Sequence, residues 1–239
     1  MNGLSQVLHE LRGIADSTLL ELEVSYRGNA RFVRRLRKSE HHAIGDAELT
    51  LSSRGSLENL VVSPFNGHPQ PIPNNSVEID VHAVGLNFKD VLNVLVPVDA
   101  AYLGFDVPPL PGSDFAGTVT GLAATNNNHS FAIGDKVYGL AFDMLRSKKC
   151  VSVDSIAKMP MGLSFEAASA LPMVFLTVLF ALKEQAGLKR GDRILIHSAG
   201  GGVGSAAVQY AHFVGAEIYA TASPSKHGYL QKQLHLGLC

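Results

Sequence analysis

Cysteine is scarce in this chain of 239 residues, which contains only Cys150 and Cys239. Two thiols cannot build a disulfide framework, and they cannot supply a zinc site made of four cysteines. Free cysteines are typical of proteins that work in a reducing compartment, so we expect a cytoplasmic protein.

Charge is also sparse, and its two signs nearly cancel. Charged residues make up 17% of the chain and the formal net charge is −1, whereas nucleic-acid-binding proteins usually carry a clear basic excess. One basic cluster runs from Arg31 to Lys38 and also contains Phe32, Val33 and Leu36. We interpret it as a solvated amphipathic segment, with a phosphate-backbone site as the alternative. The composition therefore predicts a folded protein that does not bind nucleic acid.

Long hydrophobic runs are missing as well. The longest apolar run extends from Ala170 to Leu182, which is shorter than the about 20 residues of a membrane-spanning helix. The N-terminal segment contains acidic residues and lacks the basic and apolar regions of a signal peptide. We therefore expect neither a membrane segment nor a secretory leader.

The chain changes character twice along its length. Residues 1–47 contain no motif that we can assign, and we interpret them as an upstream linker segment. Residues 48–160 are rich in glycine and proline, and residues 77–83 alternate between apolar and polar side chains, as a half-buried strand does. The segment 133–137 is typical of a turn that enters another strand. Short strands with frequent turns predict a small antiparallel β-barrel.

Residues 161–239 show helices alternating with strands. Ser164 is a candidate cap for a helix at 165–170, and Pro172 suits the first turn of a second helix that ends at Gly187. A βαβ unit follows, with strands at 193–197 and 217–221 around a helix at 205–214.

A glycine-rich turn joins the first strand of this unit to its helix. The segment from Ala199 to Gly204 matches the dinucleotide-binding fingerprint, with alanine in place of the first glycine. Gly201 would let the backbone approach a pyrophosphate, and Gly204 would let helix and strand pack closely, while the first helical N–H groups face the phosphates. We predict nucleotide binding here, with a tight structural turn as the alternative. The predicted residues are Ala199, Gly201, Gly202, Val203 and Gly204.

The end of the second strand indicates which nucleotide is bound. NAD sites place an Asp or Glu about 20 residues after the fingerprint, where it binds the ribose 2′-hydroxyl. The segment 221–226 has no carboxylate but contains Ser223, Ser225 and Lys226. Because hydroxyl donors and a positive charge suit a 2′-phosphate, we predict NADPH, bound by Ser223 and Lys226. The alternative is a capped helix with one exposed lysine.

Taken together, the motifs resemble the medium-chain dehydrogenase/reductase superfamily, and specifically the enoyl reductase domains of modular polyketide synthases and animal-type fatty acid synthases. The resemblance implies a zinc-independent, quinone-oxidoreductase-like protein of mixed α/β class. It implies a GroES-like antiparallel β-barrel at 48–160, followed by the first part of a Rossmann nucleotide-binding domain at 161–239. The matching segments are 84–92, 111–117, 133–137, 175–177, 197–204 and 220–224, and residues 26–36 resemble the segment upstream of that domain.

The resemblance also implies a reaction, in which hydride passes from NADPH to the β-carbon of an enoyl thioester carried on an acyl carrier protein. It places Asn87 and Thr177 beside the nicotinamide. From the residues alone, Asn87 is better explained as a turn-former and Thr177 as a helix residue bonded to its own turn. Asp90 is better explained as the cap of a helix at 91–95 than as a catalytic group.

Several positions depart from the family pattern. Metal-binding positions of zinc-dependent relatives hold Asn87, Ser113 and Asp114 here, so we expect no metal. The chain inserts residues 96–102, in which Tyr102 is a candidate substitute for an active-site tyrosine. Residues 142–149 replace a run of small residues, so we expect a distorted strand there.

The chain ends at Cys239 after two strands of the nucleotide-binding domain, where such domains have about six. We therefore expect an incomplete domain, with the proton donor beyond Cys239. A free-standing NADPH quinone or enone oxidoreductase is one alternative. The other is a non-catalytic structural remnant of a synthase.

Overall fold

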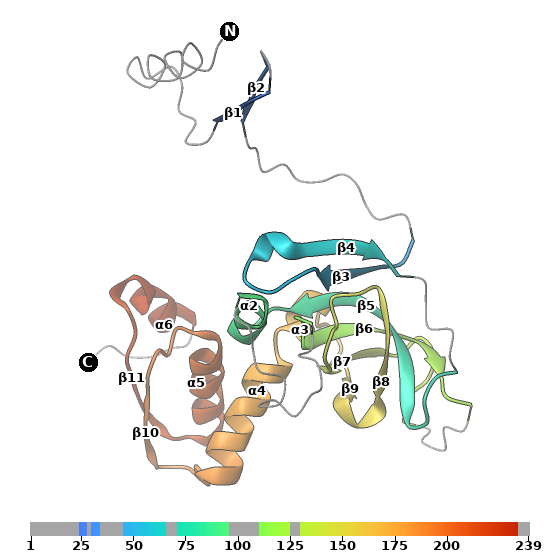
Figure 1. Ribbon diagram of the computed structural model, residues 1–239. Coiled ribbons are helices and arrows are strands. Elements are labelled where there is room, and N and C mark those ends of the chain that lie inside the picture. The colour runs from blue at the N-terminus through green and yellow to red at the C-terminus, as the bar shows by residue number, and fades with distance from the viewer. Residues whose placement is uncertain are drawn as a thin grey trace. The chain divides into compact units, whose positions relative to one another are not determined.

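The computed structural model describes residues 45–65, 71–95, 110–124 and 130–233, together with the backbone of two short strands nearer the N-terminus (Figure 1). By its internal contacts the chain divides into two units, Met1–His42 and Ala43–Cys239.

In the first unit, β1 (Val24–Arg27) pairs antiparallel with β2 (Ala30–Val33). The side chains of the basic cluster, the insertion that contains Tyr102, and Cys239 lie outside the described residues. The predictions made for these segments therefore stay predictions.

An antiparallel five-stranded sheet, in the order β8-β5-β6-β7-β9, forms the centre of the second unit. The predicted alternation is present, because Val77 and Ile79 are fully buried whereas Glu78 and Asp80 are partly exposed. The sheet therefore confirms the predicted antiparallel β domain. Its strands are β5 (Ser76–Gly85), β6 (Asp114–Leu122), β7 (Lys136–Leu140), β8 (Lys148–Ser152) and β9 (Ile156–Lys158), with a short helix η3 (Val153–Ser155) between the last two.

The predicted turn before β7 is held by side-chain contacts. Gly134 has a φ of 92°, a region that favours glycine. The carboxylate of Asp135 accepts the N–H of Ala132 at 2.8 Å and pairs with Lys158 of β9, also at 2.8 Å. Because the Gly134 N–H also donates to the Val119 carbonyl of β6 at 2.8 Å, the turn is tied to both neighbouring strands.

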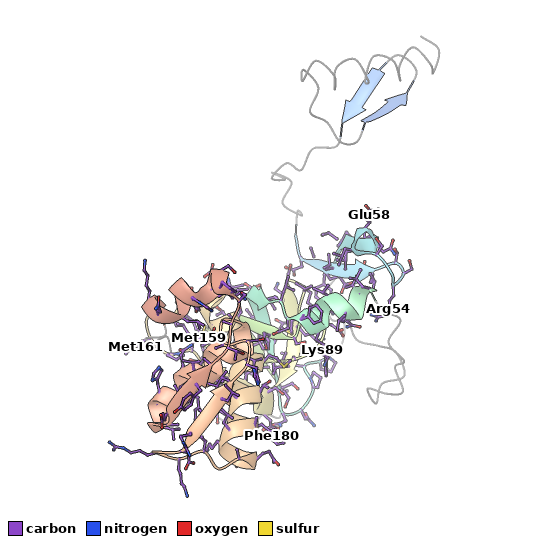
Figure 2. The ribbon with its side chains drawn as sticks, turned by 90° about the vertical axis from the view of Figure 1, so that its left-hand side faces the viewer. Arg54, Glu58, Lys89, Met159, Met161 and Phe180 are labelled. Atoms are coloured by element: carbon purple, nitrogen blue, oxygen red, sulfur yellow. The ribbon has the colours of Figure 1, made fainter. Side chains whose placement is uncertain are left out.

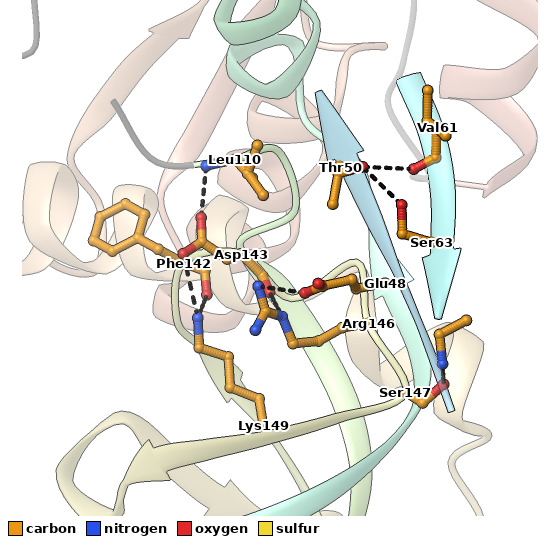
Figure 3. A network of polar contacts seen from close by, with 11 residues as sticks. Glu48, Thr50, Val61, Ser63, Leu110, Phe142, Asp143, Arg146, Ser147 and Lys149 are labelled. Atoms are coloured by element: carbon orange, nitrogen blue, oxygen red, sulfur yellow. Dashed lines mark hydrogen bonds and ion pairs between the residues drawn. The ribbon is translucent and has the colours of Figure 1, made fainter. Parts of the chain in front are cut away.

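A hairpin of β3 (Ala47–Leu51) and β4 (Leu60–Pro64), with the short helix η1 (Leu57–Asn59) between them, contacts the segment 142–149. Arg146 pairs with Glu48 at 3.3 Å, and the Ser147 hydroxyl accepts the N–H of Ala47 at 2.8 Å (Figure 3).

Within the same segment, Asp143 has a φ of 56°, accepts the N–H of Leu110 at 2.5 Å and pairs with Lys149 at 3.5 Å (Figure 3). Burial lowers the pKa of the Lys149 ammonium. Residues 142–147 are irregular and β8 starts only at Lys148, so the predicted distortion is present.

Helices connect the two halves of this unit. The Ser164 hydroxyl accepts the N–H of Ala167 at 3.2 Å, which confirms the predicted cap. The second predicted helix is α-helical at first and then continues as a π-helix before Gly187. The elements are α2 (Phe88–Leu95), α3 (Phe165–Ser169), α4 (Pro172–Val178) and the π-helix η4 (Leu179–Gln185).

The predicted βαβ unit is present, with β10 (Arg193–Ile196) and β11 (Glu217–Ala220) parallel and α5 (Gly202–Val214) between them. α5 begins at Gly202 rather than at the predicted Ser205, because the last residues of the glycine turn are themselves helical. The short helix η5 (Pro224–Lys226) and α6 (His227–Gln233) follow.

The two faces of this strand pair differ. One face packs on α5 in an apolar cluster that includes Val178, Ile196, Ala199, Val208 and Leu230. On the other face Leu195 is 57% exposed and Tyr219 is 43% exposed. None of the helices in the described part of the chain has the length and apolar character needed to cross a membrane.

Candidate functional site

Asn87 lies in the short turn between β5 and α2, and two hydrogen bonds fix its backbone. Its N–H donates to the Asp90 carboxylate at 2.7 Å, and the Asp90 N–H donates to the Asn87 carbonyl at 2.9 Å. The other carboxylate oxygen of Asp90 accepts the N–H of Gly112 at 2.8 Å. The Asp90 side chain thus makes the half of a capping box that bonds the N–H before the helix, whereas the Asn87 side chain bonds Asp114 instead of the Asp90 N–H. The helix thus begins at Phe88 rather than at the predicted Val91, because Asp90 caps it from inside the first turn.

Asp114, the first residue of β6, holds the side chain of Asn87. It is only 1% exposed. One carboxylate oxygen accepts the Asn87 side-chain amide at 2.9 Å, and the other accepts the backbone N–H of Met173 at 3.0 Å. Burial raises the pKa of the Asp114 carboxyl above its ordinary value, although these two hydrogen bonds oppose the shift. Both oxygens of this buried group are therefore engaged.

Helix α4 connects Asp114 to the glycine turn through two consecutive residues. Met173 donates to Asp114, and a Cβ atom placed on Gly202 would lie 3.4 Å from Cγ1 of Val174. One turn later the exposed Thr177 donates its hydroxyl to the Met173 carbonyl at 2.7 Å. This contact is the one expected when Thr177 is a helix residue bonded to its own turn. Its hydroxyl oxygen still has lone pairs to accept a ligand donor.

The glycine turn forms the N-terminus of α5. Gly201 is the N-cap, and no side chain caps this end. A Cβ on Gly204 would lie 2.3 Å from the Ser198 carbonyl oxygen, so helix and turn approach as closely as only glycine permits. Ala199 is fully buried and packs into the apolar cluster below the turn, so its side chain does not face a ligand.

A pocket of about 330 Å³ lies beside this turn and brings several predicted residues together. The Lys226 ammonium reaches across it and donates to the Gly200 carbonyl at 3.0 Å. The hydroxyls of Ser223 and Ser225 lie 3.3 Å apart, and that of Ser223 makes no cap bond to the following helix. The lining residues are Ser198, Gly200, Gly201, Thr221, Ala222, Ser223 and Lys226.

Known proteins share this architecture. A family model for the alcohol dehydrogenase GroES-like domain matches residues 73–163. The low-reducing polyketide synthase drtA of Aspergillus calidoustus is 37% identical over 192 residues, which are 79% of this chain and 8% of that protein. The pikromycin polyketide synthase component PikAII of Streptomyces venezuelae is 39% identical over 177 residues, 72% of this chain and 4% of that protein.

Solved structures agree with these matches. The CurK enoyl reductase superposes with a TM-score of 0.74 and 40% identity, over 80% of this chain and 58% of that one. The chain belongs to the medium-chain dehydrogenase/reductase superfamily, in the branch of polyketide synthase enoyl reductases. A quinone oxidoreductase from Coxiella burnetii, with a TM-score of 0.66 and 33% identity, covers 78% of this chain and 59% of that one. The chain spans less than a tenth of the synthases and less than two thirds of these solved chains.

Of the three residues that the sequence analysis placed at metal-binding positions, Asn87 and Asp114 are bonded to each other. Asp114 is committed to Asn87 and Met173, and the N–H of Ala141 donates to the Ser113 carbonyl at 2.9 Å. Within the part of the chain that the structure describes, no group of three His, Cys, Asp or Glu residues is arranged to hold a metal ion.

A second pocket of the enoyl reductase region, of about 650 Å³, lies along α4 and η4, from which Phe180 also extends into solvent (Figure 2). Leu171, Phe175 and Leu179 line it together with residues of β7 and β9. At 3.6 residues per turn, these side chains lie on the face of the helix opposite Met173 and Thr177. This pocket therefore lies on the other side of α4 from Thr177.

Proposed function

We propose that this chain forms part of an NADPH-dependent enoyl reductase in polyketide or fatty acid synthesis. Its substrate is an α,β-unsaturated thioester on an acyl carrier protein, presented by neighbouring domains of a cytoplasmic synthase. In this proposal residues 48–160 contribute the substrate side and residues 161–239 the nucleotide side. The observation that carries it is the joint contact of α4 with Asp114 of the β domain and with Gly202 of the glycine turn.

The N-terminus of α5 is suited to a pyrophosphate. Its first N–H groups belong to Gly202, Val203 and Gly204, and the N-cap Gly201 offers no side chain to occupy them. The dipole of an α-helix favours a negative charge at this end. We therefore assign the phosphate contacts to residues 201–204.

The pocket beside the turn is suited to an adenosine 2′-phosphate. Lys226 provides a positive charge and Ser223 a hydroxyl, and both line the pocket together with Gly200 and Gly201. An ammonium group has three donors, so Lys226 can keep its bond to the Gly200 carbonyl while it contacts a phosphate. No carboxylate lines this pocket to bind a ribose 2′-hydroxyl in its place.

When bound, NADPH supplies the hydride for the β-carbon of the substrate, and the protein has three tasks. The protein must orient the nicotinamide, stabilise the negative charge that develops on the thioester oxygen, and deliver a proton to the α-carbon. We assign orientation to Asn87 and Thr177, which α4 holds in a fixed relation to the glycine turn. We assign the proton to no residue of this chain.

Cofactor titration tests the proposal. We expect NADPH to bind at least about tenfold more tightly than NADH, which is the order of one charge-assisted hydrogen bond. Lys226→Ala should remove this preference, because it should lower the affinity for NADPH and leave the affinity for NADH unchanged. Lys232→Ala, on the exposed surface of α6, is the matched control and should change neither affinity. Equal affinities in the unmodified chain, or a preference for NADH, would contradict the assignment of Ser223 and Lys226.

A free-standing quinone or enone oxidoreductase is the second candidate, because the quinone oxidoreductase from Coxiella burnetii has a closely similar fold. The two functions differ in their electron acceptor. Oxidation of NADPH with a quinone but not with crotonyl-pantetheine, by a protein that contains this region, would favour the second candidate.

A further inference from the structure

We propose that Asp114 is a positioning residue, which determines which end of the Asn87 side-chain amide faces the bound cofactor. This inference rests on the proposed function and deepens it, because it assigns a polarity to one contact with the nicotinamide half of NADPH.

Asp114 determines the orientation of the Asn87 amide. An ionised carboxylate accepts hydrogen bonds and donates none. Both oxygens of Asp114 act as acceptors, one from the Met173 N–H and one from the Asn87 amide. The group of Asn87 that faces Asp114 must therefore be its NH₂, and its carbonyl oxygen Oδ1 must point the other way. Among the described residues, no hydrogen bond reaches this oxygen, and the side chain is partly exposed.

Asn87 and Asp114 are both held rigidly by further hydrogen bonds. The backbone of Asn87 is held by Asp90, and Asp90 is held in turn by the N–H of Gly112. The carboxylate of Asp114 cannot turn away, because its second oxygen is bonded to the first turn of α4. The same turn contacts the glycine loop through Val174. Oδ1 of Asn87 is therefore fixed relative to the helix terminus that binds the pyrophosphate.

The exposed carbonyl oxygen of Asn87 selects the kind of ligand group that it can bind. A fixed carbonyl oxygen binds a donor, such as the carboxamide N–H or a ribose O–H of the nicotinamide riboside half. It does not stabilise the thioester oxygen, which needs a hydrogen-bond donor. Asn87 thus contacts the cofactor, and the donor for the thioester oxygen lies elsewhere in the enzyme.

Asp114→Asn tests this polarity. The new amide can still accept the Met173 N–H through its oxygen, but its NH₂ then faces the NH₂ of Asn87. Because two donors cannot bond, Asn87 turns its amide over and presents NH₂ to the cofactor. We expect NADPH to bind about five- to tenfold more weakly, the loss of one hydrogen bond. The affinity for 2′,5′-ADP, which lacks the nicotinamide half, should not change.

Reversing the pair provides a rescue. In the double variant Asn87→Asp with Asp114→Asn, position 114 donates and position 87 accepts, and an oxygen again faces the cofactor. We expect the double variant to recover most of the NADPH affinity that Asp114→Asn loses. Asp80→Asn, a partly exposed position of β5, is the matched control and should change neither affinity. Thermal unfolding of each variant without ligand monitors folding.

A signal that needs no ligand comes from NMR. The side-chain NH₂ of Asn87 bonded to a carboxylate should resonate downfield in the unmodified chain, and this shift should vanish in Asp114→Asn. The proposal is overturned if the downfield shift is absent from the unmodified chain, or if Asp114→Asn lowers the affinities for NADPH and 2′,5′-ADP equally. If neither ligand binds the unmodified chain, the proposed function fails rather than the assignment of Asp114. In that case the NMR shift alone decides the amide orientation.

Discussion

Replacing Gly204 with alanine should both destabilise the chain and weaken nucleotide binding. A Cβ at this position would lie 2.3 Å from the Ser198 carbonyl oxygen and 2.8 Å from the Cα of Ala199. Side-chain carbons do not approach backbone atoms this closely, so helix α5 would have to move away from the turn by about 1 Å to reach ordinary contact.

The magnitude follows from two opposing effects. Alanine is favoured over glycine in a helix by about 1 kcal/mol. Overpacking against atoms that cannot move typically costs about 1–3 kcal/mol, and here both neighbours are backbone. Taking the upper part of that range, we expect Gly204→Ala to lower the free energy of unfolding by about 2 kcal/mol. The displaced N–H groups should also bind NADPH more weakly.

Urea denaturation of two matched variants measures this effect. Gly228 lies in α6 and has no heavy atom within 4 Å of a Cβ placed on it. Gly228→Ala should therefore stabilise the chain by about 0.5–1 kcal/mol through helix propensity alone. If Gly204→Ala is as stable as Gly228→Ala, the close approach of helix and turn is not the reason for glycine at position 204.

Two further substitutions test the local structure. Ser164→Ala removes the acceptor for the N–H of Ala167 and should lower the free energy of unfolding by about 1 kcal/mol in the same assay. Ser164→Asp should keep most of the stability of the unmodified chain, because aspartate also caps helices. Asp135→Asn should cost less than about 1 kcal/mol at pH 7, because the ion pair with Lys158 is partly exposed and screened. Lys158 and the N–H of Ala132 lower the pKa of the Asp135 carboxyl in the folded state. Its contribution is therefore present at neutral pH and is lost as the pH falls through that lowered pKa, so the difference between the variant and the unmodified chain should shrink with acidification and vanish below that pKa.

The sequence predicted those parts of the fold that depend on local patterns. The alternation at residues 77–83 gave β5, the hydroxyl of Ser164 capped α3, and the glycine turn lay between a strand and a helix, as predicted. Each of these depends on a period, a cap or a glycine, and residues close in sequence decide them. Helix boundaries were less accurate, because Asp90 caps α2 from within its first turn and α5 begins inside the glycine turn.

The role of Asp114 was not predicted, because it depends on contacts between distant segments. From the sequence, Asp114 was expected only not to bind a metal. Its partners, Asn87 and Met173, are 27 and 59 positions away, and no spacing rule connects them. A charged residue at the start of a strand with no other charge was the available indication, since a buried carboxylate needs partners. The roles of the remaining predicted site residues stay predictions until the cofactor titrations are made.

The two consecutive contacts of α4 have a consequence for building hybrid reductases from related proteins. Met173 is bonded to Asp114 of the β domain, whereas the next residue, Val174, lies beside Gly202 on the nucleotide side. A junction between parental sequences should therefore not fall within this helix or just before it. Even the insertion of one amino acid there would rotate one contact by about 100° relative to the other. The turn around Gly187 and Gly191, where both glycines have positive φ and open surroundings, is the safer place to join two parents.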